Sequence, residues 1–96
     1  MKKFAYMLMG ALFDPDNHTA EFETGMIIRV VTVRNAQEAR DTVIQLKNEG
    51  FGVIELCGAF TREFALELTE LTDGEVGIGY SIHEPEQNEV FDKFFS

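Results

Sequence analysis

A chain of 96 residues has material for one hydrophobic core, so we expect a single domain over residues 1–96. Its content of 45% hydrophobic and 26% charged residues is ordinary for a globular protein and gives no indication of disorder. The net charge of -9 argues against nucleic-acid partners and anionic membranes, because an acidic surface repels phosphate groups.

The amino-terminal segment imitates a secretory signal. Lys2 and Lys3 precede an apolar run over residues 4–13, but Asp14 follows at once, without a small-residue cleavage site, and the run is too short to cross a bilayer. Large side chains alternate on both faces of Phe4–Met9, which is typical of a strand covered on each side. We therefore predict that this segment is the first strand.

The next segment, residues 10–25, reads as a loop with several turn residues. A loop of this length is either functional or contains a short helix, which the sequence would place around Pro15–Phe22. Met26–Val33 is rich in isoleucine and valine and is predicted to be the second strand, with Arg29 as its one charge.

Two helices follow, each with recognisable ends. Asn35 is the predicted N-cap of a helix that begins at Ala36 and stops at Gly50. Thr61 is the predicted N-cap of a second helix, over about Arg62–Leu71, whose apolar residues recur at helical spacing.

Between and after these helices lie two more predicted strands, Val53–Cys57 and Val76–Ser81. The fold class is therefore α/β, with a four-stranded, mainly parallel sheet in the order β-β-α-β-α-β. The tail, residues 82–96, ends in a short amphipathic helix that would close over a groove, with apolar positions at Val90, Phe91, Phe94 and Phe95. Two helices on one face would leave the other face bare, so we expect a homodimer with a two-fold interface.

Glu55 stands in the middle of an apolar strand, where a buried carboxylate must be paired or protonated. If the strands over 26–33 and 53–57 are neighbours, Arg29 is its natural partner and the pair is structural. Otherwise Glu55 is available as a general base.

Cys57 ends its strand just before a helix N-terminus, where a thiol pKa can fall and the sulfur can act as a nucleophile. The alternative is an inert core cysteine, since no neighbouring base can be identified. As the only cysteine, it excludes an internal disulfide and a cysteine-rich zinc site, and it suits a reducing cytoplasm.

His83 follows the last strand and His18 follows the first, so they could converge as a general base or as ligands, or simply be solvated. They lack the spacing of a helical His-x-x-x-His site, so no metal is predicted, and no cofactor motif is recognised.

The residues Asp14-Pro15, His18, Val53–Phe60 and His83 give the chain a likeness to a known group of sequences. It resembles a small prokaryotic family of compact α/β proteins classed only as a domain of unknown function. The resemblance extends to about His83 and is most specific at Glu55-Leu-Cys-Gly58. The chain has Ala59 where the family usually has a second glycine. Its acidic, phenylalanine-rich tail also differs from the usual ending of the family. The resemblance implies the architecture and no activity.

The carboxyl edge of a parallel sheet is where such folds bind ligands, and the start of a helix there can receive an anion. We therefore predict a small-ligand site, with a ligand that can carry an anionic group, formed by Glu55, Cys57, Gly58, Thr61, Ser81 and His83. One alternative is a small enzyme with Glu55 or His83 as general base and Cys57 as nucleophile. Another is a structural subunit whose sheet face exists for assembly.

Overall fold

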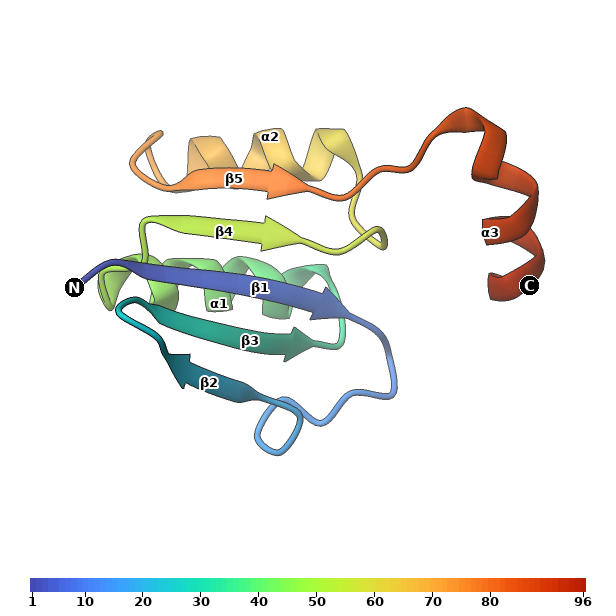
Figure 1. Ribbon diagram of the computed structural model, residues 1–96. Coiled ribbons are helices and arrows are strands. Elements are labelled where there is room, and N and C mark those ends of the chain that lie inside the picture. The colour runs from blue at the N-terminus through green and yellow to red at the C-terminus, as the bar shows by residue number, and fades with distance from the viewer.

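The computed structural model describes all residues from 1 to 96, and a mixed sheet of five strands organises it (Figure 1). The strands lie in the order β2-β3-β1-β4-β5, and only β2 runs antiparallel to its neighbour. Their bounds are β1 (Lys3–Met9), β2 (Ala20–Glu23), β3 (Ile27–Val33), β4 (Val53–Leu56) and β5 (Gly77–Tyr80).

The prediction of four strands is wrong by one, because β2 lies within the expected loop and no helix forms at Pro15–Phe22. Residues 20–23 alternate apolar and acidic side chains, and Gly25, with φ +84°, turns the chain back into β3. The strand is four residues long and wholly exposed, so its pattern alone is weak. Its pairing with β3 stabilises it.

The helices agree with the sequence prediction, and so do their caps. They are α1 (Ala36–Asn48), α2 (Arg62–Leu71), a 3-10 turn η1 (Pro85–Gln87) and α3 (Asn88–Phe95). The Asn35 side chain accepts a hydrogen bond from the Glu38 amide, and Thr61 accepts one from the Phe64 amide. Gly50 follows α1 with φ +92°, a left-handed conformation that favours glycine.

The core lies between one face of the sheet and the two helices α1 and α2, which both sit behind the sheet in Figure 1. Thirteen buried apolar residues form one cluster, and the alternation along the four parallel strands sends every second side chain towards it. Its centre consists of Ala5 and Met7 of β1, Ile54 and Leu56 of β4, Val43 and Leu46 of α1, and Leu68 of α2.

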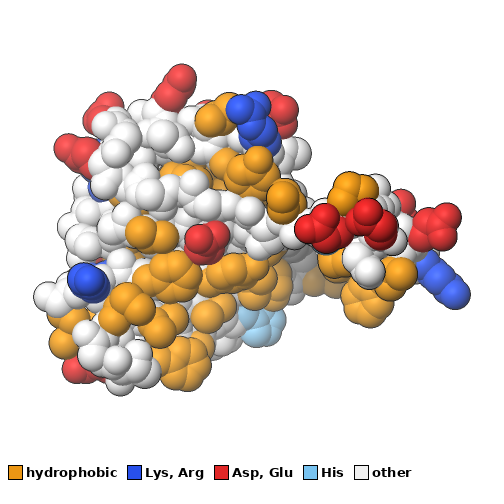
Figure 2. All heavy atoms as spheres, turned by 45° about the horizontal axis from the view of Figure 1, so that its top comes forward, with side chains coloured by type: hydrophobic (Ala, Val, Ile, Leu, Met, Phe, Trp, Pro, Cys, Tyr) orange, Lys and Arg blue, Asp and Glu red, His pale blue; other side chains and the backbone are white.

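The opposite face of the sheet, which we call the open face, has no helix over it. Hydrophobic side chains gather on it (Figure 2), and its strand positions hold one charged residue, Glu55. The apolar members are half-buried or exposed and comprise Phe4, Tyr6, Leu8, Phe22, Ile28, Val30 and Val53. Sheets built mainly from parallel strands usually have both faces covered.

The short helix α3 stands away from the sheet beyond the carboxyl ends of the strands (Figure 1). The radius of gyration of 13.8 Å therefore exceeds the roughly 12.5 Å expected for a compact domain of this length. None of the helices has the length and hydrophobicity that crossing a bilayer would require.

Candidate functional site

A hollow of about 910 Å³ lies between the carboxyl edge of the sheet and α3. This size is within the range of small-molecule sites. Most of the lining is hydrophobic: Leu8 and Met9 end β1, Phe13 comes from the following loop, and Phe91 and Phe95 come from α3. The hollow is therefore an apolar site open to solvent.

Four of the six predicted site residues line this hollow: Cys57, Gly58, Ser81 and His83. Ser81 follows β5, and its hydroxyl donates a hydrogen bond to the Leu56 carbonyl at 3.1 Å. The Tyr6 hydroxyl, from the open face, lies 3.0 Å from the Ser81 hydroxyl. These contacts fix the Ser81 side chain at the rim where β4 and β5 end.

His83 connects the end of the sheet to α3. Its ring stacks on Phe91 with centroids 3.7 Å apart, and its Nε2 lies 2.7 Å from the Asn88 side-chain oxygen. The imidazole thus ties the segment after β5 to α3. The predicted short helix of the tail is present, while its closing over a groove stays a prediction. Asn88 and Phe91 were not predicted as site residues, although the apolar spacing of the tail marked Phe91 as one face of a helix.

The turn after β4 has unused hydrogen-bond donors, and its residues Gly58 and Ala59 line the hollow. The backbone N–H groups of Gly58 and Ala59 have no acceptor within the chain, whereas the N–H of Cys57 is bonded to the Met7 carbonyl at 3.0 Å. A β-carbon at residue 58 would meet no atom within 4 Å, so no other part of the chain covers this side of the turn. These two amides can bind an acceptor atom of a ligand.

Thr61 and Glu55 do not line the hollow. Thr61 is used as the N-cap of α2, and its hydroxyl is 3.1 Å from the Phe64 amide nitrogen. Glu55 lies on the open face between Tyr6 of β1 and Gly79 of β5. A β-carbon on Gly79 would be 2.8 Å from the Glu55 carboxyl carbon, so the glycine provides the space into which this side chain folds.

The expected ion pair of Glu55 with Arg29 is wrong, because β1 lies between β3 and β4 and Arg29 faces the helices. Arg29 instead donates hydrogen bonds to Glu21 at 2.7 Å and to Glu49 at 3.0 Å, and its guanidinium lies 4.7 Å from the Phe51 ring centroid. The Glu55 carboxylate has no hydrogen-bond or ion-pair partner in the chain.

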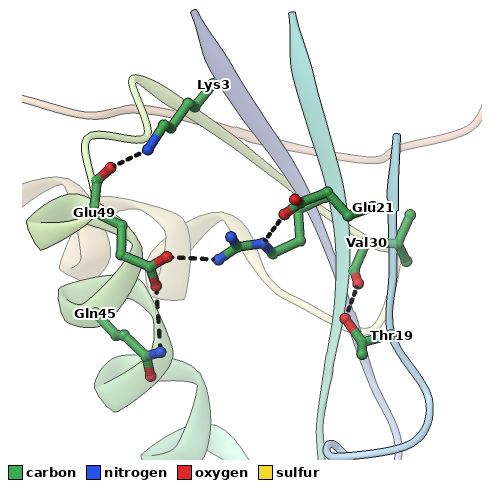
Figure 3. Close-up of polar contacts among 7 residues, drawn as sticks. Lys3, Thr19, Glu21, Val30, Gln45 and Glu49 are labelled. Atoms are coloured by element: carbon green, nitrogen blue, oxygen red, sulfur yellow. Dashed lines mark hydrogen bonds and ion pairs between the residues drawn. The ribbon is translucent and has the colours of Figure 1, made fainter. Parts of the chain in front are cut away.

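Figure 3 shows this network, in which Glu49 at the end of α1 also accepts from Gln45 and offers its carbonyl to Lys3. The hydrogen bond from Arg29 is the main cause that lowers the pKa of Glu49 below its ordinary value. The network ties β2, β3 and the end of α1 together, so Arg29 has a structural role.

Replacing Arg29 by methionine is expected to lower the free energy of unfolding by about 1–2 kcal/mol, from two partly exposed ion pairs and one cation–π contact. Because the pKa of Glu49 is lowered, its contribution is complete at neutral pH and is lost as the pH falls through that lowered pKa. Urea denaturation at pH 7 and at about pH 3 should therefore show a smaller difference between Arg29→Met and the natural chain in acid.

Arg34→Met is the matched control, because Arg34, which precedes the N-cap of α1, forms an ion pair with Glu38 four residues on. Its cost should be about 0.3–0.5 kcal/mol. Equal costs at both arginines would contradict the structural role of Arg29.

His18 and His83 do not come together. His18 stays in the loop after β1, where its Nδ1 accepts a hydrogen bond from the Asp14 amide at 2.8 Å, and it is not part of the hollow. No group of three or more metal-binding side chains exists in the chain. A smaller depression of about 220 Å³ is lined by Asp14, Asp16, Glu38 and Asp41, and Arg34 neutralises part of that charge.

A search against families of related sequences matches residues 2–96 to a family of unknown function, DUF6506. The chain belongs to this family. The match includes α3, so the DUF6506 domain extends past His83, where the sequence resemblance was expected to end, and reaches the end of the tail. No curated protein and no solved structure matches the chain.

Proposed function

We propose that this member of the DUF6506 family binds a small ligand in the hollow beneath α3 and works as a homodimer in the cytoplasm. The hollow carries the proposal: its size suits a small molecule, and a mostly apolar wall with a few polar groups is typical of ligand sites. The cytoplasmic location is supported by the lone, half-buried Cys57.

The lining also indicates the chemistry of the ligand. Phe13, Phe91 and Phe95 offer aromatic surface for an apolar or aromatic body. The unused amides of Gly58 and Ala59 suit an acceptor group such as a carboxylate, while Asp92 on the opposite wall repels a second negative charge. A planar, mostly apolar molecule with one anionic group fits these features best.

A second candidate function, assembly alone, is favoured by the bare open face. An apolar sheet face of this kind is normally covered in the working form of a protein. The two functions are compatible, because the hollow and the open face share few residues.

The ligand proposal is tested by titrating the protein with benzoate and with neutral benzyl alcohol while recording backbone amide NMR spectra. We expect saturable shifts at Gly58, Ala59 and Ser81, with benzoate binding at least about tenfold more tightly than benzyl alcohol. Ala59→Phe should abolish the shifts by filling the hollow. Ala11→Phe, an exposed loop alanine outside the hollow, should leave them unchanged.

Shifts that do not saturate, or that appear mainly on the open face, would contradict the ligand site. Equal binding of the two probes would show that the ligand needs no anionic group, and would support an apolar site alone.

A further inference from the structure

The apolar residues of α3 form one band along the helix, and only part of this band lines the hollow. Phe91, 39% exposed, and Phe95, 77% exposed, line the hollow. Val90 and Phe94 do not line it and are 62% and 78% exposed, and the Phe94 ring meets the Phe95 ring edge-on with centroids 4.9 Å apart. At about 100° per residue, Phe94 lies roughly 40° from Val90 around the helix, and Lys93 lies roughly 60° to the other side of Val90. We call Val90, Lys93 and Phe94 the outer stripe.

The open face presents the complementary surface. Its apolar side chains surround Glu55, the only charged residue at its strand positions, and that carboxylate is unpaired. Lys93 is the only lysine or arginine after Arg62 in the sequence, and it also forms no ion pair. One unpaired cation flanks an apolar stripe, and one unpaired anion lies within an apolar face.

The accessible surface indicates how much area remains to be covered. The chain exposes 6487 Å², about 900 Å² more than the roughly 5,600 Å² expected for a folded monomer of this mass. A standard stable interface covers about 800 Å² on each partner. The excess is therefore of the size that one protein interface removes.

From these three observations we infer that the outer stripe of α3 docks on the open face of a second copy, where Lys93 meets Glu55. In the proposed dimer a two-fold axis relates the copies, so that each α3 docks on the open face of the other copy and neither surface is left bare. Phe91 and Phe95 stay over the hollow of their own chain. The inference rests on the self-association proposed above and does not depend on the ligand.

The first test is the mass in solution, measured by light scattering at micromolar concentration. The natural chain should have twice the mass of one chain, and Phe94→Asp should raise the dimer dissociation constant at least 100-fold. Leu12→Asp, at a residue that is 97% exposed in a loop, is the matched control and should leave the dimer intact. Far-ultraviolet circular dichroism shows that each variant is folded.

The second test is charge exchange. Glu55→Lys alone and Lys93→Glu alone should each weaken the dimer about tenfold or more, while the double variant should recover most of the affinity. Lys2→Glu makes the same charge change at an exposed lysine outside the proposed contact and should have little effect.

The third test traps the contact between chains. In a Cys57→Ser background, a chain with Glu55→Cys is mixed with a chain with Lys93→Cys under mild oxidation, and a mixed disulfide dimer is expected on a non-reducing gel. A monomeric natural chain would overturn both the self-association and this inference. A dimer that survives Phe94→Asp and forms no mixed disulfide would overturn this inference alone. A monomeric chain carrying both cysteines that closes an internal disulfide would show that α3 folds back on its own sheet, and would also overturn it.

Discussion

Leu56→Ala is expected to lower the free energy of unfolding by about 2–5 kcal/mol, because it leaves a cavity at a fully buried position. Leu56 lies on the helix-covered face of β4, in the same cluster as Met7 and Leu68. It is also the last residue before the turn that presents the Gly58 amide, so the loss should spread to the candidate site. Urea denaturation followed by circular dichroism measures the change.

Val53→Ala is the matched control, on the same strand but on the open face, where Val53 is 41% exposed. It should cost no more than about 1 kcal/mol in the monomer. Both variants should be made together with Phe94→Asp, so that covering of the open face by a second copy does not contribute. Equal losses at the two positions would show that the core is not confined to the helix-covered face.

Phe91→Ala is expected to unfold α3, by removing its stack on His83, while the rest of the fold remains intact. A helix of eight residues is unstable alone, so α3 depends on the His83–Phe91 stack, which is worth about 0.5–1.5 kcal/mol. Hydrogen exchange at the amides of α3 should accelerate about tenfold, and benzoate binding should weaken to a similar extent. Mass spectrometry of peptides from the tail measures the exchange.

Phe94→Ala provides the comparison, because it removes the same type of side chain from the same helix on the side that does not line the hollow. It should leave benzoate binding in place and weaken the dimer. If both variants change both measurements alike, α3 acts as one unit and the separation of its two sides is wrong.

Local sequence patterns were sufficient for most of the elements. The caps at Asn35 and Thr61, the left-handed Gly50 and the apolar spacing of the tail each depend on residues within a few positions of one another. The short β2 was missed because an exposed strand of four residues has little pattern of its own, and its hydrogen bonds with β3 decide whether it forms.

The sequence predicts the part of the candidate site that depends on strand direction and misses the part that depends on the position of the tail. Cys57, Gly58 and Ser81 follow the ends of parallel strands, so the sequence places them at one edge whatever the strand order. Thr61 is predicted both as the N-cap of α2 and as a ligand-binding residue. In the structure its hydroxyl accepts the hydrogen bond of the Phe64 amide and acts as the N-cap. His83 could be placed near the edge, but its stack on Phe91 depends on where the tail turns back.

By itself the sequence determined the helices, where they begin, and every strand except β2, since contacts between near neighbours control these features. It also determined that the residues after β4 and β5 meet at one edge, because these strands are parallel. Only the tertiary structure decided that β1 separates β3 from β4 and that Arg29 binds Glu49 at the end of α1. It also decided that Glu55 is left without a partner on a bare face. Strand order is set by packing between residues far apart in the chain, and no local pattern records it.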